Sequence, residues 1–379
     1  MMKNFSTQNL RTVFAEDNKY DSFRRVASNL VQGIDTYEID DNGNERRITP
    51  ADANKAIRKV FMEICGLTED DLRSRKKVQR ARHAHEVEIY EIIEEDIELV
   101  VNKGLQESEY FNQFVESKSH ALGDANAFYM EAPNQYLIVG NYSGDHHDVT
   151  MQQLGEGEEF SVRCTSHTVK IGKDIDLIIL GRYDYQKLID KIAASYLKDI
   201  QESIFADVYA ASSKLPAALK GSGALSASTK EDFDELLELV GIANDSDVMI
   251  VGTKMALKKI TALADVDWAT VAQKESIALN GRLGTYEGTT LMEVPQRLKL
   301  GASLSTFDPD TDLVLPNDKL LIIPVAVDKF VKFFDEGETQ IFDITQKADL
   351  KDDFETHEVR RDYGHEVVLG RYFGEWTLE

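Results

Sequence analysis

Basic residues are scarce in this sequence of 379 residues, which holds 43 Lys and Arg against 67 Asp and Glu and carries a formal net charge of −24. A protein that reads nucleic acid needs a basic face for the phosphate backbone, so this balance argues against that class. The same acidity favours solubility at high concentration and weak contact with phosphate.

Cysteine is almost absent as well. Cys65 and Cys164 lie far apart without CxxC spacing, which argues against a disulfide framework and predicts a reduced compartment. No apolar run approaches the ~20 residues that span a bilayer, and the best candidate, Leu320–Val327, contains Pro324 and predicts a buried strand. The first residues lack the apolar core of a secretory signal, so we expect a cytoplasmic protein with no membrane partner.

Metal-ligating motifs are also missing. Asp145-His146-His147-Asp148 is the most metal-like run, but neighbouring residues of an extended chain point in opposite directions, so we interpret it as a polar loop tip. His83-Ala84-His85-Glu86 lacks the second histidine of an HExxH helix. Asp308-Pro309-Asp310-Thr311-Asp312 lacks the central glycine and final glutamate of an EF-hand, which favours an acidic turn.

Catalytic motifs are no better represented. Gly221-Ser222-Gly223 and Gly281-Arg282-Leu283-Gly284 resemble phosphate loops only superficially, because no Gly-Lys-Ser/Thr completes either one. No GxSxG is present, and Cys164 in a strand-like run is interpreted as a small hydrophobic residue. We therefore expect no catalytic, cofactor-binding or metal residues and no cofactor. Scattered carboxylates remain a possible catalytic set.

What the sequence does contain is a long hairpin pattern followed by a long helix. The strand-like run Tyr136–Val139 enters a polar, glycine-marked stretch from Gly140 to Glu159, and a second strand-like run returns from Phe160 to Ile171. Apolar residues then recur every three or four positions from Tyr185 to Tyr209, which predicts an amphipathic helix of about 38 Å. This order is typical of a shell-forming subunit, with a protruding hairpin and a stiff strut.

Two charged segments precede the hairpin. A helix is predicted from Thr49-Pro50 to Gly66, and it is followed by the basic patch Arg73–Arg82. The acidic helix predicted over Glu86–Asn102 comes next. A basic segment before an acidic one suits pairing between subunits, although two solvated faces explain the same pattern.

Helices and strands alternate in the second half. Strands are predicted at Asp247–Val251, Thr289–Val294 and Leu320–Val327, and Gln340–Ile344 forms a further one. The last two predicted strands, Thr356–Arg361 and Glu366–Tyr372, are expected to flank a turn at Tyr363-Gly364. The mixture predicts an α+β protein.

The order of these landmarks resembles the major capsid protein of tailed bacteriophages, with the Hong Kong phage capsid fold that encapsulins share. The hairpin and the long helix carry the resemblance, together with the runs Asp247–Met255, Gly288–Pro295 and Arg361–Gly370. The likeness covers roughly residues 75–379 and is architectural.

The resemblance implies six regions. They are an N-terminal arm at 1–75, the start of a peripheral domain at 76–135, the extended hairpin loop at 136–171, the spine helix of the peripheral domain at 172–214, an axial domain at 215–353, and C-terminal strands returning to the peripheral domain at 354–379. Some relatives carry a Lys–Asn crosslink, but Lys170 and Lys173 lie at the base of this hairpin, too far from its tip to support one.

The function implied by the resemblance is structural and not enzymatic. The chain would assemble with itself into hexamers and pentamers of an icosahedral shell that encloses double-stranded DNA without sequence-specific binding. We expect a separate scaffolding protein and a portal as partners, assembly in the host cytoplasm, and a final place in the virion. Two alternatives stay open at this point: an encapsulin-like compartment, and a cytoplasmic α/β enzyme with carboxylates around Asp308–Asp312.

Overall fold

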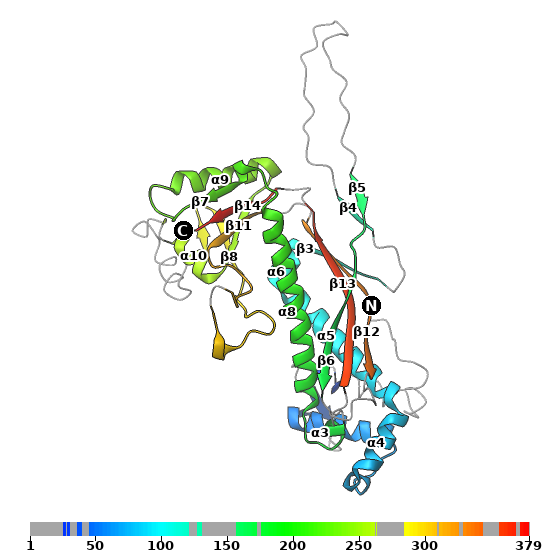
Figure 1. Ribbon diagram of the computed structural model, residues 1–379. Helices are drawn as coiled ribbons and strands as arrows, with labels where there is room; N and C mark the ends of the chain where they lie inside the picture. The colour runs from blue at the N-terminus through cyan, green and yellow to red at the C-terminus, as the bar shows by residue number, and fades with distance from the viewer. Residues whose placement is uncertain are drawn as a thin grey trace.

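The computed structural model describes residues 26–27, 29–30, 36–39, 45–120, 127–130, 157–172, 176–261, 263, 284–308, 311–325, 329–343, 356–368 and 372–378. Helices and two larger sheets share these ranges in an elongated arrangement (Figure 1), which confirms the α+β class. The predicted strand 136–139 and most of the polar stretch that follows it lie outside the described residues.

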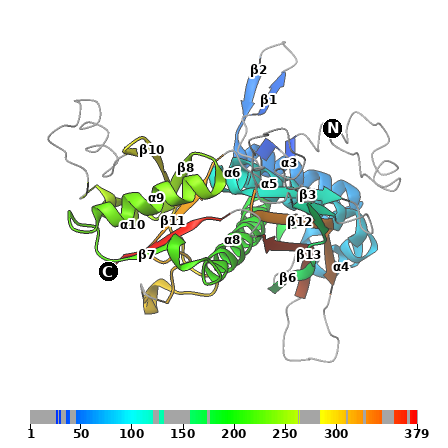
Figure 2. The same cartoon turned by 90° about the horizontal axis from the view of Figure 1, so that it is seen from above.

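The N-terminal part is mainly helical. Its elements are β1 (Thr36–Ile39), β2 (Glu45–Ile48), α3 (Pro50–Ile64), the 3-10 turn η1 (Asp71–Arg73), α4 (Arg75–Ala84), α5 (Glu86–Glu107) and α6 (Glu109–Phe114). The predicted start of α3 is confirmed, because the Thr49 side chain accepts a hydrogen bond from the Asp52 amide and Pro50 is the first helical residue. β1 and β2 form a two-stranded hairpin that projects from the body (Figure 2).

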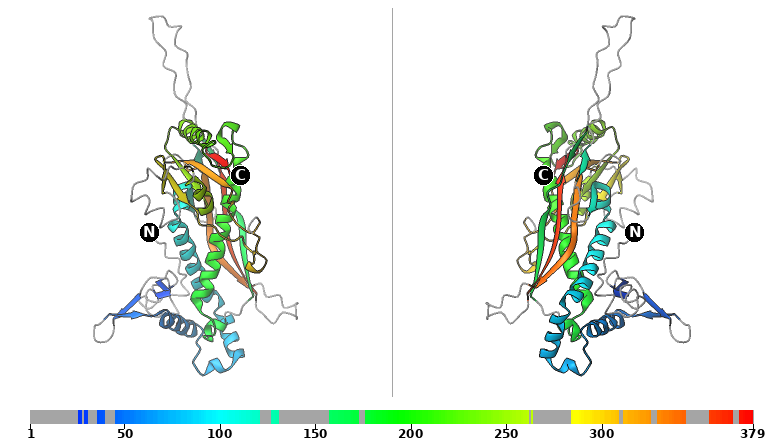
Figure 3. Two further views of the ribbon diagram at one scale, coloured as in Figure 1. Left: turned by 90° about the vertical axis from the view of Figure 1, so that its left-hand side faces the viewer. Right: turned by 90° about the vertical axis from the view of Figure 1, so that its right-hand side faces the viewer.

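A four-stranded sheet has the order β3-β12-β13-β6, and its long strands lie lengthwise along α8 (Tyr185–Ser212) (Figure 1). Its strands are β3 (Val115–His120), β12 (Val331–Asp343), β13 (Thr356–Val367) and β6 (Thr165–Gly172), and only the β3–β12 pair is parallel. The helices α5 and α8 pack on one another, α5 against β12 and α8 against β13. Figure 3 shows both helices following the sheet lengthwise.

A six-stranded mixed sheet forms the other unit, in the order β7-β14-β11-β8-β10-β9. Its strands are β7 (Lys220–Ser222), β14 (Gly374–Thr377), β11 (Lys319–Pro324), β8 (Val248–Gly252), β10 (Thr289–Glu293) and β9 (Thr285–Tyr286). The helices α9 (Lys230–Asn244) and α10 (Lys254–Ile260) pack against it. The short elements β4 (Phe128–Met130), β5 (Glu158–Phe160), α7 (Asp176–Ile179), η2 (Ala217–Leu219) and η4 (Leu304–Thr306) complete the described secondary structure.

The two sheets share hydrophobic core. Alternate residues of a strand face opposite sides of a sheet, and in β11 Leu320 and Ile322 join the core under α9 and α10. Their neighbours Leu321 and Ile323 belong instead to the large core that contains α5 and α8. The six-stranded sheet therefore has a buried layer on each face, and one of these layers connects it to the rest of the molecule.

The long helix is confirmed with the start that the periodicity predicts. α8 begins at Tyr185 and runs to Ser212, three residues beyond the predicted end, so that its 28 residues make a rod of about 42 Å. Its apolar stripe is buried, including Ile189, Ile192 and Ile200. The acidic helix is also confirmed, although α5 extends past Asn102 to Glu107.

Of two predictions about the C-terminal third, one is wrong and the other is confirmed only in part. No turn interrupts the chain at Tyr363-Gly364, because β13 is one strand from Thr356 to Val367. The reason for the glycine is a close contact: a Cβ atom on Gly364 would lie 2.2 Å from the carbonyl oxygen of Arg163. The strand predicted at 340–344 is only the end of β12, which begins at Val331.

Candidate assembly surface

The base of the hairpin is fastened to the face of the four-stranded sheet opposite α8. β4 and β5 are antiparallel, with Phe128 opposite Phe160, and they flank residues 131–156, which lie outside the described residues. The Phe128 ring lies 6.1 Å from the Phe160 ring and 6.3 Å from that of Phe334 on β12. Val162 completes this small core, so the two ends of the hairpin are held on the sheet by aromatic packing.

The predicted return strand is divided. β5 ends at Phe160 and β6 begins at Thr165, with buried Val162 between them. β6 is an outer strand of the sheet, and its backbone pairs on one side with β13. The hairpin base is therefore continuous with a strand that ends the sheet among the described strands.

A polar seam joins α8 to this sheet. The Asp199 carboxylate lies 2.9 Å from the His167 Nδ1 atom and accepts a hydrogen bond from the Tyr363 hydroxyl. These two donors hold the pKa of Asp199 below its ordinary value. Thr165 Oγ1 lies 3.0 Å from the other nitrogen of His167, whose ring stacks on Tyr363 at 3.9 Å. The seam fixes the rotation of α8 on β6 and β13.

The seam continues along α8 in both directions. The Tyr196 hydroxyl donates a hydrogen bond of 2.6 Å to the carbonyl oxygen of Val359. Two turns of helix beyond Asp199, Asp207 Oδ2 lies 2.9 Å from His365 Nε2, at ion-pair distance but without hydrogen-bond geometry. Each contact joins α8 to β13, so helix and strand form one rigid unit.

A buried ion pair lies on the helix-facing side of the sheet. Arg361 of β13 and Asp335 of β12 are 2% and 6% exposed, and the guanidinium donates to both carboxylate oxygens. Arg361 Nη2 also donates to Asn102 Oδ1 of α5 at 2.9 Å. Bidentate geometry of this kind offsets the desolvation of both charges and joins two strands to one helix.

The opposite face of the sheet carries charged residues beyond the hairpin base. Lys332, which is fully buried, reaches Glu116 of β3 at 2.5 Å. Further along, Glu358 lies 3.9 Å from Lys170 and 3.2 Å from Arg360. The Arg360 guanidinium in turn covers the ring of Phe342, which is 40% exposed. This face offers a neighbouring molecule a mixed polar and aromatic surface.

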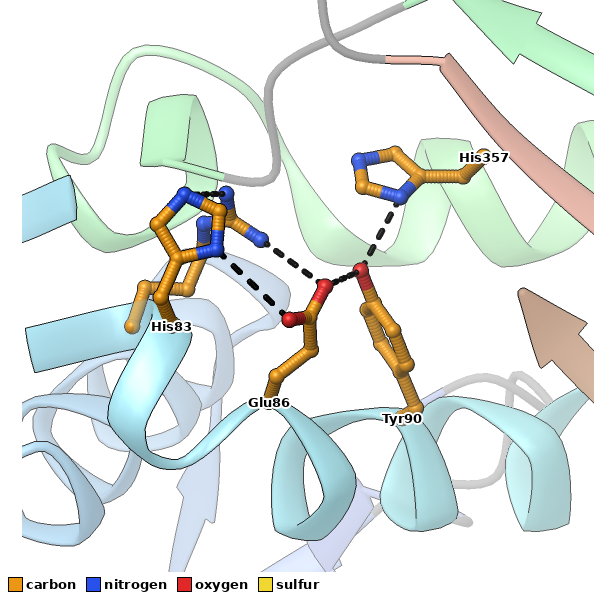
Figure 4. A network of polar contacts seen from close by, with 5 residues as sticks. His83, Glu86, Tyr90 and His357 are labelled. Atoms are coloured by element: carbon orange, nitrogen blue, oxygen red, sulfur yellow. Dashed lines mark hydrogen bonds and ion pairs between the residues drawn. The ribbon is translucent and has the colours of Figure 1, made fainter. Parts of the chain in front are cut away.

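A second polar network lies where α4 meets α5 (Figure 4). The Glu86 carboxylate accepts a hydrogen bond from Tyr90 and lies 3.5 Å from Arg82 and 3.6 Å from His83. The Tyr90 hydroxyl is also 3.0 Å from His357 Nδ1 on β13. His83 thus belongs to a structural network. The run His83–Glu86 spans the end of α4 and the start of α5, with His85 at the break between the two helices.

A groove of about 420 Å³ lies between α5, α8 and the segment after β10. Leu105, Leu197, Phe205 and Pro295 are among its apolar lining residues, and Arg297 is also part of its wall. It marks the junction between the two units of the molecule. No group of three or more metal-ligating side chains gathers here or elsewhere in the described ranges.

The other candidate motifs lie partly within the described residues and partly outside them. Asp145–Asp148 lies outside the described residues, as do positions 309–310 and 281–283. Gly221 belongs to β7, and a Cβ atom there would lie 2.1 Å from the Trp376 ring, which explains the glycine by packing. Burial and nearby carboxylates, Glu336 first, raise the pKa of the Cys164 thiol to about 12, which makes it a poor nucleophile.

The side chains that fasten the hairpin base and α8 to the four-stranded sheet were not predicted from the sequence. The partners in each contact are far apart along the chain: 128 with 334, 199 with 363, and 335 with 361. One signal was available, because Asp335 directly follows the apolar pair Phe333-Phe334 and a charge in a buried strand needs a partner. The sequence does not say which cation that partner is.

No described helix is both long and apolar enough to cross a bilayer. No curated protein sequence matches the chain. Among solved structures, one from the Microbacterium phage Oxtober96 is 15% identical, with a TM-score of 0.44 over 72% of this chain and 91% of that one. The mature capsid of bacteriophage PhiM1 is 10% identical, with a TM-score of 0.44 over 72% of this chain and 87% of that one.

The holo-SrpI encapsulin complex from Synechococcus elongatus PCC 7942 gives 11% identity and a TM-score of 0.37, over 70% of this chain and 84% of that one. Since all three TM-scores are below 0.5, the assignment depends on the family match. Over residues 23–377 the sequence matches the family described as "SPbeta prophage-derived putative capsid protein YonB". This match spans nearly the whole chain, and the chain therefore belongs to the YonB family of prophage-derived capsid proteins.

Proposed function

We propose that the chain is the major structural subunit of a phage shell, which assembles with itself into hexamers and pentamers of a closed icosahedral container for double-stranded DNA. The observation that carries the proposal is the match to a capsid protein family over residues 23–377. The rigid unit of α8 and the four-stranded sheet, with a hairpin fastened to its face, supports it. Closed symmetric assembly multiplies contacts that are individually modest.

The proposal gives each part of the chain a role in the Hong Kong phage type of fold. Residues 1–75 are an N-terminal arm, and the unit built on α5, α8 and the four-stranded sheet is the peripheral domain. The six-stranded sheet with α9 and α10 is the axial domain, whose tips meet at the five-fold and six-fold axes. The hairpin that leaves β4 and returns through β5 reaches over an adjacent subunit.

The proposed role is structural and not catalytic, and the product is a virion assembled in the host cytoplasm. A separate scaffolding protein and a portal complete the assembly, and the acidic chain holds packaged DNA without sequence-specific binding. An encapsulin-like compartment would use the same type of subunit around a cargo enzyme. The contents of the particles distinguish the two, since one shell contains DNA and the other contains protein.

Assembly state tests the proposal directly. Purified chain, alone and with the products of the neighbouring genes, is examined by light scattering and negative-stain microscopy. Capsomers, shells or tubes are the expected result. A strictly monomeric or dimeric species at high concentration, even beside a scaffolding partner, would refute the proposal.

The hairpin is tested by a deletion. Replacing residues 137–152 with a short Gly-Ser linker keeps β4 and β5 and their aromatic core. We expect a folded subunit, with unchanged circular dichroism, that fails to form closed shells. An equal deletion confined to residues 264–280, which follow α10 in the chain and also lie outside the described residues, serves as the comparison for general damage. Normal shells from the 137–152 deletion would remove the hairpin from the assembly mechanism.

A further inference from the structure

The segment that ends in α4 has the opposite charge to the rest of the chain. Residues 45–84 contain eleven Lys and Arg against six Asp and Glu, whereas the whole chain has 43 against 67. α4 itself holds five basic residues and no acid. Figure 1 places this helix at one end of the elongated molecule, away from α9 and α10. A cationic end on a strongly acidic chain calls for a physical explanation.

The orientation of α4 is fixed. Val78 and Arg82 lie one helical turn apart and are both fully buried, so they define the inner face of the helix. Arg82 Nη1 lies 3.5 Å from Glu86 Oε1, and the same carboxylate accepts a hydrogen bond from Tyr90 (Figure 4). Tyr90 extends the network to His357 on β13. α4 therefore cannot roll to bury its opposite face.

That opposite face is cationic and exposed. Lys76 and Arg80 are exposed and one turn apart, on the side away from Val78. Their neighbour Lys77 lies 2.9 Å from Asp71, so its charge is already matched within the chain. No carboxylate is paired with Lys76 or Arg80 among the residues that the structure describes. These two cations are available to a partner outside the subunit.

We propose that the Lys76–Arg80 face of α4 contacts carboxylates of a second copy of this chain in the assembled shell. The inference rests on the proposed function as a self-assembling subunit and names one contact within it. Copies with a net charge of −24 repel one another, and a cationic end set against an acidic surface reduces that repulsion. Surfaces of the required sign exist on every copy: α9 alone exposes Glu231, Asp232, Glu235 and Glu238.

A second copy fits this face better than DNA does. The two cations of the face could accept phosphate, but the remainder of the chain is acidic and would repel the rest of a duplex. A second copy is present at high local concentration wherever a shell exists, and the contact repeats at every equivalent position. Binding to nucleic acid is therefore the alternative that the experiment must separate.

Zero-length crosslinking identifies the partner. Shells are assembled from equal amounts of ¹⁴N-labelled and ¹⁵N-labelled chain and treated with a carbodiimide, which joins an amine to a carboxylate that touches it. Peptide mass spectrometry then shows whether Lys76 is bonded to an Asp or Glu peptide of the other isotope. We expect such mixed-isotope crosslinks. Their absence from well-formed shells overturns the inference.

Neutralising variants measure what the contact contributes. We expect K76Q/R80Q to raise the threshold concentration for assembly about threefold or more at about 0.05 M salt, where charges act over more than ~10 Å. At about 1 M salt, where the screening length is ~3 Å, the difference from wild type should vanish. The matched control K258Q/K259Q removes two exposed lysines from α10 and should leave the threshold unchanged.

The outcomes are separable. Equal thresholds for K76Q/R80Q and wild type at low salt overturn the inference and leave the proposed function intact. If K76Q/R80Q assembles normally and loses only retained DNA, the inference is also overturned and the face is assigned to nucleic acid. Crosslinks from Lys76 to a scaffolding protein alone likewise overturn the inference and leave the proposed function intact. A wild-type chain that forms no shell under any condition overturns the proposed function itself.

Discussion

The buried ion pair of Arg361 and Asp335 shows how much one side chain can contribute to the stability of the four-stranded sheet. Both side chains are almost fully buried, so removal of the cation strands a carboxylate in the core. We expect Arg361→Leu to lower the free energy of unfolding by about 3–5 kcal/mol. Urea denaturation of the unassembled subunit measures the change. The neighbouring Arg360→Leu removes a half-exposed cation and should cost within about 1 kcal/mol, so equal losses in both variants would contradict this account.

Asp199 predicts how the α8 seam responds to acid. His167 and Tyr363 depress the pKa of Asp199 in the folded state, so the unfolded chain binds the proton more readily. The stabilisation is therefore fully present above the unfolded pKa of about 4 and is lost as pH falls through the lower folded pKa. Melting temperatures of the subunit between pH 6 and pH 3 should fall less steeply for Asp199→Asn than for wild type. Parallel curves would show that the seam contributes nothing through this carboxylate.

At the scale of elements, the sequence predicts what local periodicity controls. The helix α8 begins where its apolar spacing begins, and the cap of α3 lies at Thr49 as expected, because both depend on residues within a few positions. The strands depend on distant partners. β12 and β13 pair at ten positions, and neither their length nor their register follows from either segment alone.

The same distinction between local and distant contacts explains which features of the hairpin base could be predicted. A long hairpin could be expected from its polar, glycine-marked composition, but the anchor of its base could not, since Phe128 and Phe334 are brought together only by the fold. At Gly364 the local signal is misleading. Turn preferences predict a turn there, whereas Gly364 lies in the middle of β13, where the backbone of residues 163 and 164 passes too close for any side chain.

This interpretation of Gly364 predicts a specific defect. In Gly364→Ala the new methyl group would meet the Arg163 carbonyl at 2.2 Å, and neither backbone can yield without disturbing the link between β5 and β6. We expect a loss of about 1–3 kcal/mol in unfolding free energy, together with faster amide exchange around Val162. Gly284→Ala, where the added carbon meets nothing within 4 Å, is the matched control. A turn at Gly364 would instead tolerate alanine, with exchange at Val162 unchanged.

At the scale of the whole molecule, the chain connects its two units more than once. β13 belongs to the four-stranded sheet, and β14, which follows it, belongs to the six-stranded sheet. The core beneath α5 and α8 extends to Leu321 and Ile323 of β11, so packing as well as chain connectivity joins the units. The alternation of helix and strand in the sequence predicts both classes of element but does not distribute them between sheets. A subunit built in this way presents its charges to neighbours in fixed positions.

Those charges predict how assembly depends on salt. Two copies of a chain with net charge −24 repel over a distance that shrinks from about 30 Å at 0.01 M ionic strength to about 10 Å at 0.1 M. Apolar contacts between copies are not weakened by this change, so the assembled fraction of wild-type chain should rise between these two concentrations. Static light scattering at constant protein concentration and pH 7 measures it. The proposed α4 contact has the opposite salt dependence, because added salt also screens its attraction and so weakens assembly. The difference in assembled fraction between K76Q/R80Q and wild type at each salt concentration isolates the contribution of this contact. If assembly instead decreased steadily from the lowest salt upward, attraction between opposite charges would dominate every interface, and net repulsion could not be what the cationic end of the molecule relieves.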